Sequence, residues 1–197
     1  MVMSAHPDLA AYFFEMEKLV EAQPDSVIAE IARGAYAMSP RPRPRHGALQ
    51  ARLTSFLEGA VGIGGTLEAP DWLFVIEPEI RSLETFSRLV PDLAGWRRST
   101  TGWPDLDATP VSLIPDWVAE ILSPATESFD RGPKKDAYGL MGVGWLWLLD
   151  PDTRTVETFA SVRSKMIAGP AFGASDHVSA PPFESLRLPL DSMFPSG

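Results

Sequence analysis

The chain of 197 residues is long enough for one domain with a substantial core, and a hydrophobic content of 45% with six tryptophans indicates a folded protein. It contains no cysteine, which excludes disulfides and thiolate zinc sites and fits a reducing, cytoplasmic location. A net charge of −9 argues against a surface for loose, sequence-independent DNA binding, although residues 41–46 form a local basic cluster. No segment has the pattern of a signal peptide or the roughly 20 apolar residues that span a membrane.

Apolar periodicity and turn residues predict the elements of the chain. In order, they are a helix at 8–22, a hairpin turning at Gly34, a proline-rich loop, a helix from His46 to about Glu58, strands at 72–80 and 90–98, a turn-rich loop at 99–115, a buried strand at 117–122, a helix through Tyr138, a hairpin around 150–154, and a tail with a strand and a short helical turn. We expect Gly59 and Gly142 to end the two central helices.

This order favours an α/β or α+β fold in which helices flank a mixed central sheet, with additional β-hairpins. The chain has no internal repeat and no boundary that suggests a second domain. We therefore expect a single domain over residues 1–197, with residues 1–25 as a helical extension at its N-terminus.

Two carboxylates occupy predicted strands. Glu120 lies in the apolar segment PDWVAEIL, where alternation places it on the same strand face as Val118 and Leu122. Asp92 follows a proline at the start of the strand in LVPDLAGW. A buried charge must be paired, protonated or bound to a metal, and the two carboxylates lie close together if their strands pair.

These two acids, with Lys134 near the start of the next helix, are the parts of a metal-dependent phosphodiesterase site. Two carboxylates about 4 Å apart repel by roughly 4 kcal/mol at an effective dielectric near 20, so a proton or a divalent cation is needed between them. Carboxylate oxygens suit Mg²⁺ or Mn²⁺, which would acidify a bound water. We expect Asp92 and Glu120 to bind the metal and Lys134 to orient the water or to neutralise the transition state.

Three further residues are candidates for accessory roles. Glu30 lies in the strand before the first hairpin turn, His46 opens a helix after the basic loop, and Glu79 is on the predicted strand at 72–80. Tyr138 shares a helix face with Lys134, and we interpret it as packing. The three main site residues also have structural explanations: Asp92 could cap the start of its strand, Glu120 could pair with an arginine, and Lys134 could be a solvated helix charge. The sequence contains no GxSxG, phosphate-binding glycine-rich loop or HExxH motif that would favour another enzyme class.

The order and spacing of several segments resemble the Uma family of restriction-endonuclease-like proteins. The matching segments are AEIARGAYAMSPRPRPRHGALQARL, VIEPEIR, LVPDLAGWRR, PDWVAEILSPAT, the D-x-x-x-K-x-x-x-Y stretch of Asp130, Lys134 and Tyr138, and GVGWLWLLDPDTRTVETF. This family is similar to the PD-(D/E)xK nuclease superfamily, which implies a mixed sheet with helices on its faces and a metal site at a strand end.

The resemblance implies that Asp92 and Glu120 are the two metal-binding acids. The residue two positions after Glu120 is Leu122 in place of the lysine of the superfamily pattern, and the resemblance suggests that Lys134 supplies the amine from the following helix. The expected function is a Mg²⁺-dependent nuclease, with DNA as a partner and a homodimer as the assembly. The alternatives are a catalytically inactive binding or assembly protein with the same fold, and hydrolysis of a smaller phosphodiester.

Overall fold

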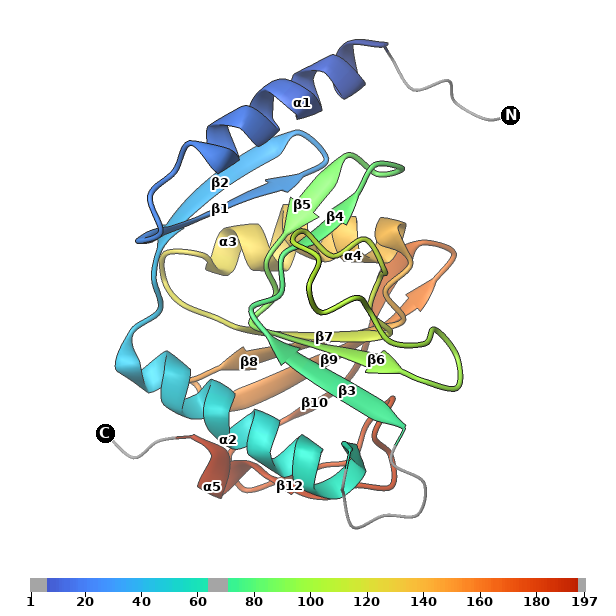
Figure 1. Ribbon diagram of the computed structural model, residues 1–197. Coiled ribbons are helices and arrows are strands. Elements are labelled where there is room, and N and C mark those ends of the chain that lie inside the picture. Colours follow the sequence, from blue (N-terminus) through green and yellow to red (C-terminus); the bar gives the residue numbers. More distant parts are fainter. Residues whose placement is uncertain (1–6, 64–70, 195–197) are drawn as a thin grey trace.

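The computed structural model describes residues 7–63 and 71–194 of the chain (Figure 1). The elements are α1 (Pro7–Glu21), β1 (Val27–Ala32), β2 (Ala35–Pro40), α2 (Pro44–Val61), β3 (Trp72–Ile76), β4 (Ile80–Ser82), β5 (Ser87–Leu89), β6 (Leu93–Arg97), β7 (Trp117–Ile121), α3 (Glu127–Phe129), the irregular helical turn η1 (Asp130–Lys134), α4 (Lys135–Met141), β8 (Trp145–Asp150), β9 (Thr155–Val162), β10 (Lys165–Phe172), β11 (His177–Val178), β12 (Leu188–Pro189) and α5 (Leu190–Met193).

Six strands form the central sheet, in the order β10-β9-β8-β7-β6-β3. β7 and β8 are parallel, and the other neighbours are antiparallel. A parallel pair requires a crossover connection, which α3, η1 and α4 supply on one side of the sheet, while α2 lies on the other side (Figure 1). The predicted fold class, a mixed sheet flanked by helices, is confirmed.

A second, smaller sheet has the order β2-β1-β5-β4 and lies between α1 and the crossover helices (Figure 1). The predicted hairpin of β1 and β2 turns at Gly34, whose φ of +87° favours glycine. The N-terminal helix packs onto this sheet through Phe13, which is fully buried and whose ring centroid lies 5.8 Å from that of Phe86.

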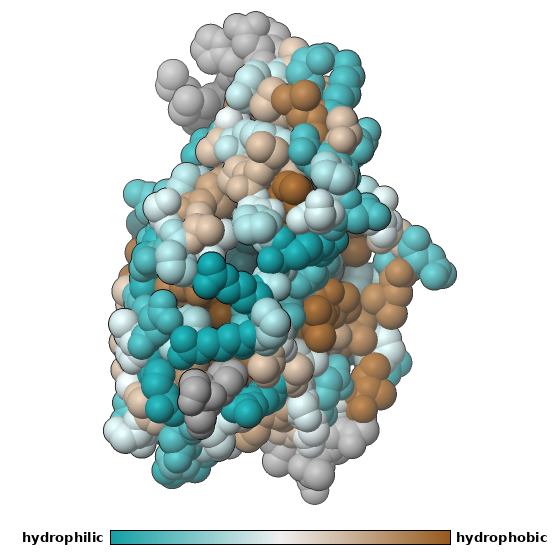
Figure 2. Space-filling view, turned by 90° about the vertical axis from the view of Figure 1, so that its left-hand side faces the viewer, coloured by the Kyte–Doolittle hydropathy of each residue, from teal (hydrophilic) through white to brown (hydrophobic). Residues whose placement is uncertain are grey.

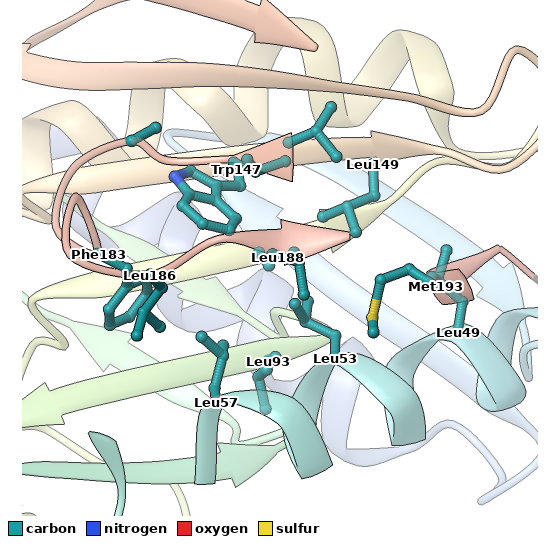
Figure 3. Close-up of a cluster of buried hydrophobic side chains, with 14 of the residues drawn as sticks. Leu49, Leu53, Leu57, Leu93, Trp147, Leu149, Phe183, Leu186, Leu188 and Met193 are labelled. Atoms are coloured by element: carbon teal, nitrogen blue, oxygen red, sulfur yellow. The ribbon is translucent and has the colours of Figure 1, made fainter. Parts of the chain in front are cut away.

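The two faces of the central sheet carry separate hydrophobic cores. On one face, Leu49, Leu53 and Leu57 of α2 pack with side chains of β7 and β8 and of the C-terminal tail (Figure 3). On the other face, Val118 and Leu122 pack with α4 residues such as Tyr138. Since Glu120 alternates with Val118 and Leu122, its side chain belongs to this second face, as the strand pattern predicts.

Several predicted boundaries are wrong. α2 continues past Gly59 to Val61, whereas Gly142, with a φ of +94°, does follow the end of α4. The strand predicted at 72–80 is two strands, β3 and β4, separated at Pro78, which has no N–H for a sheet ladder. The helix predicted through Tyr138 is divided into α3, η1 and α4, and β5 and β10 were not predicted as strands.

In residues 7–63 and 71–194, no helix is long and apolar enough to cross a membrane.

Candidate functional site

The pairing of β6 with β7 brings Asp92 next to Glu120. Leu93 pairs with Ala119 in this antiparallel ladder, so the preceding residue, Asp92, lies level with Glu120. The backbone N–H of Ile121 donates to Oδ2 of Asp92 at 2.6 Å. The two strands do pair, which is the condition under which the sequence places the two carboxylates close together, and both acids lie at the end of the sheet where β7 leads into the crossover.

Lys134 returns from the crossover to the same place. Its side chain is 3% exposed, and its Nζ lies 2.9 Å from Oε1 of Glu120 and 2.9 Å from Oε1 of Glu30. Nζ also donates to the carbonyl oxygen of Val90 at 3.0 Å and lies 3.8 Å from Oδ1 of Asp130. The lysine therefore joins the first hairpin, the central sheet and the crossover through one buried ammonium group.

Burial sets the electrostatics of this group, which we call the acidic cluster (Glu30, Asp92, Glu120, Asp130 and Lys134). Burial raises the pKa of Glu120 well above its ordinary value, and Lys134 only partly opposes the shift. Burial likewise raises the pKa of Asp130 to about 6. Burial acts to lower the pKa of Lys134, but Glu120, Glu30 and Asp130 outweigh it and raise that pKa well above its ordinary value. The ammonium group of Lys134 therefore stays charged, and its single positive charge stabilises the ionised forms of several neighbouring acids at once.

Two residues that the sequence did not place in the site contact it. The Tyr138 hydroxyl donates to Oε1 of Glu120 at 2.5 Å, and burial raises the pKa of Tyr138 well above its ordinary value. Asp130 faces Lys134 from one turn earlier. The sequence did contain a signal for both contacts: Asp130 and Tyr138 lie four residues before and after Lys134, and residues four apart share a helix face.

Of the three accessory candidates, His46 and Glu30 lie at the site and Glu79 does not. His46, in the first turn of α2, places Nε2 2.8 Å from Oδ1 of Asp92, and Gln50 donates to the Asp92 carbonyl oxygen at 2.6 Å. Glu30 is part of the acidic cluster. Glu79 is not brought to it: its carboxylate pairs with Arg88 and lines a separate hollow of about 500 Å³.

The acidic cluster borders a cavity of about 340 Å³. Its lining includes Glu30, Asp92, Glu120 and Lys134, together with exposed arginines from the connection between β2 and α2 and from the start of α2, Arg41, Arg43 and Arg45. Figure 2 views the side of the molecule that carries this connection and α3, and it shows a hollow near the centre bordered by hydrophilic residues. The site thus combines an acidic interior with a basic rim.

The donor set fits a divalent cation of the Mg²⁺ type in part. Three carboxylates share one ammonium and Asp92 lies beside Glu120, so the acidic cluster has excess negative charge whenever its acids are ionised. In the described ranges, 7–63 and 71–194, no three His, Asp or Glu side chains are arranged as a complete metal site. Mg²⁺ does not require one, because it is commonly bound by one or two carboxylates plus water and substrate phosphate. Asp92 and Glu120 are the pair that could hold it.

Comparisons with known proteins agree with this fold. A crystal structure described as that of "a putative nuclease belonging to DUF820" from Anabaena variabilis matches with a TM-score of 0.69 and 20% sequence identity, covering 91% of this chain and 96% of the other. At this identity the likeness concerns the fold. A comparison with curated proteins gave no match. The model of the Uma2 family, described as "Putative restriction endonuclease", matches residues 10–191. The chain therefore belongs to the Uma2 family.

Proposed function

We propose that the chain is a Mg²⁺-dependent nuclease that hydrolyses phosphodiester bonds in DNA at the acidic cluster. The observation that carries the proposal is the convergence of Asp92, Glu120 and Lys134, from β6, β7 and the crossover, on one cavity. The description of the family supports DNA as the substrate, because a restriction endonuclease acts on DNA.

In this proposal Asp92 and Glu120 hold the ion. Bound Mg²⁺ would acidify a water molecule and stabilise negative charge on the phosphoryl group. The protein itself fixes the two carboxylates: Ile121 N–H and His46 hold Asp92, and Tyr138 and Lys134 hold Glu120. Lys134 provides positive charge beside the reacting phosphate, and its own position depends on Glu30 and the Val90 carbonyl.

Calorimetric titration with Mn²⁺ tests the metal site. We expect wild-type protein to bind Mn²⁺ and the variants Asp92→Asn and Glu120→Gln to lose that binding while they remain folded by circular dichroism. Glu79→Gln is the matched control, because its carboxylate pairs with Arg88 outside the acidic cluster, and it should bind Mn²⁺ as wild type does. Cleavage of duplex DNA with Mg²⁺ should follow the same order, and full activity of Asp92→Asn would reject the assignment.

A binding or assembly protein with the same fold is the second candidate. The observation that favours it is the closure of the acidic cluster, in which Lys134 is buried and already paired with carboxylates. Wild-type protein that neither binds Mn²⁺ at millimolar concentration nor cleaves DNA would support this candidate.

We also propose that the nuclease acts as a homodimer, since cleavage of both strands of a duplex requires two sites or two events. Sedimentation of the purified protein with and without duplex DNA tests the assembly. A monomer under both conditions would contradict it.

A further inference from the structure

The connection between β2 and α2 and the first two residues of α2 form a short run of alternating arginine and proline, Arg41 to Arg45, and each of these residues except Pro44 lines the cavity of the acidic cluster. Proline fixes φ near −65° and has no N–H, so Pro42 and Pro44 stiffen the segment and leave it few backbone donors. The arginine side chains therefore provide most of what this segment can offer a ligand.

The two outer arginines are anchored to the protein. Arg41 donates from Nε to the Asp25 carbonyl oxygen at 2.7 Å and pairs with Glu77 at 3.0 Å. Arg45 donates to the Pro151 carbonyl oxygen at 2.7 Å and pairs with Asp152 at 3.2 Å. Each of these guanidinium groups already has a carboxylate partner, so neither carries an uncompensated charge.

Arg43, between them, differs. Its side chain is exposed, and within residues 7–63 and 71–194 its guanidinium group makes no hydrogen bond or ion pair. The first turn of α2, which begins at the next residue, contains no acidic side chain to neutralise it. The segment thus holds one unpaired guanidinium at the cavity, on a backbone stiffened by proline and tied down on both sides.

We propose that Arg43 binds a backbone phosphate of the nucleic-acid strand that enters this cavity, next to the phosphate at the acidic cluster. The inference rests on the proposed function for the location of the second phosphate. A guanidinium group can bind phosphate through two parallel hydrogen bonds, and its planar fork loses less conformational entropy per hydrogen bond than a flexible ammonium does. In a chain with a net charge of −9, such a local cation decides where a polyanion can approach.

The salt dependence of DNA binding tests this role without cleavage. Binding of a fluorescent duplex oligonucleotide is measured by anisotropy in EDTA across a range of NaCl concentrations. Removal of one phosphate contact should lower the slope of log K against log salt by about one and weaken binding roughly tenfold near 0.1 M salt. We expect this result for Arg43→Ala, whereas Arg43→Lys, which keeps the charge, should retain the wild-type slope.

Arg187→Ala is the matched control, because Arg187 is also exposed but does not line the cavity. It should leave both the affinity and the slope at their wild-type values. An unchanged slope in Arg43→Ala, or an equal loss in Arg187→Ala, would overturn the inference. These outcomes are separate from the failure of the nuclease proposal: wild-type protein that binds DNA through Arg43 but cleaves nothing would reject only the nuclease activity.

Discussion

At the scale of single residues, the acidic cluster holds more negative charge than its one lysine can balance. Removing an ionised group from water is costly, and a buried carboxylate without a close cation takes up a proton more readily. Lys134 lies 2.9 Å from both Glu120 and Glu30 but 3.8 Å from Asp130. Of the three acids that form ion pairs with this lysine, Asp130 is therefore the one whose charge it compensates least closely, and it should respond to pH.

The variant Asp130→Asn should change how stability depends on pH. Burial raises the pKa of Asp130 from 3.8 to about 6, so between these values the folded protein holds a proton that the unfolded chain has lost. The free energy of unfolding should consequently fall as pH rises from about 4 to 6, by roughly 3 kcal/mol from this residue. Urea denaturation at several pH values should show a flatter profile for Asp130→Asn. Asp136→Asn, exposed on α4, is the control, and profiles that coincide for wild type and Asp130→Asn would contradict the prediction.

The sequence predicted the strand acids of the cluster better than its other members. Alternation along 117–122 fixed the face of Glu120, and pairing of two neighbouring strands was enough to bring Asp92 beside it. Contacts between side chains of segments that were not predicted as paired strands were harder to predict from the sequence. The partner of Glu79 is Arg88, nine residues later on β5, a strand that the sequence analysis missed, so Glu79 could not be separated from the true neighbours of Lys134.

At the scale of elements, the crossover between β7 and β8 positions Lys134 through an interrupted helix. The apolar pattern predicted one continuous helix, but Gly132 has non-helical dihedral angles (φ −112°, ψ −105°) and Pro133 lacks the N–H that a regular turn uses. The irregular turn η1 results, and Asp130 and Lys134 are both buried within it. The pair Gly132-Pro133 was a readable signal for a break, whereas the direction in which the chain resumes depends on packing against the sheet.

β5 and β10 were missed for physical reasons that differ. β5 has the sequence Ser-Arg-Leu and is buried at all three residues, so no alternation of polar and apolar side chains marks it. β10 contains Gly169 and Pro170, and its pairing with β9 is irregular between Ala168 and Ala171. Strands of these kinds are stabilised by their neighbours more than by their own pattern.

Gly59 and Gly142, both predicted to end helices, should respond oppositely to substitution. Gly59 lies inside α2, where it is exposed and where a Cβ atom would meet open space, so Gly59→Ala should raise the free energy of unfolding by about 0.5–1 kcal/mol. Gly142 adopts a φ of +94°, where a side chain costs roughly 1–2 kcal/mol, so Gly142→Ala should lower it by that amount. Urea denaturation of both variants measures the difference, and changes of the same sign would contradict the assigned helix ends.

At the scale of the whole molecule, the central sheet separates the acidic cluster from the larger hydrophobic core. Glu120 faces the crossover side, whereas its neighbours Ala119 and Ile121 face α2 and the C-terminal tail. Phe183, from the tail, is 2% exposed and lies against four aromatic rings (Figure 3 shows its place beside Trp147). The tail thus completes the core on the face opposite the site, and stability and metal binding should be separable by mutation.

Phe183→Ala should test this separation. The ring centroid of Phe183 lies 4.9 Å from that of Trp72 and 5.2 Å from that of Trp117, and its loss would leave a cavity among rings that cannot close around it. The free energy of unfolding should fall by about 3–5 kcal/mol in urea denaturation. Trp103→Ala, which removes a ring that is 42% exposed, should cost less than about 1 kcal/mol. Under conditions where Phe183→Ala remains folded, its Mn²⁺ affinity should equal that of the wild type; a parallel loss of affinity would mean that the tail also shapes the acidic cluster through the sheet.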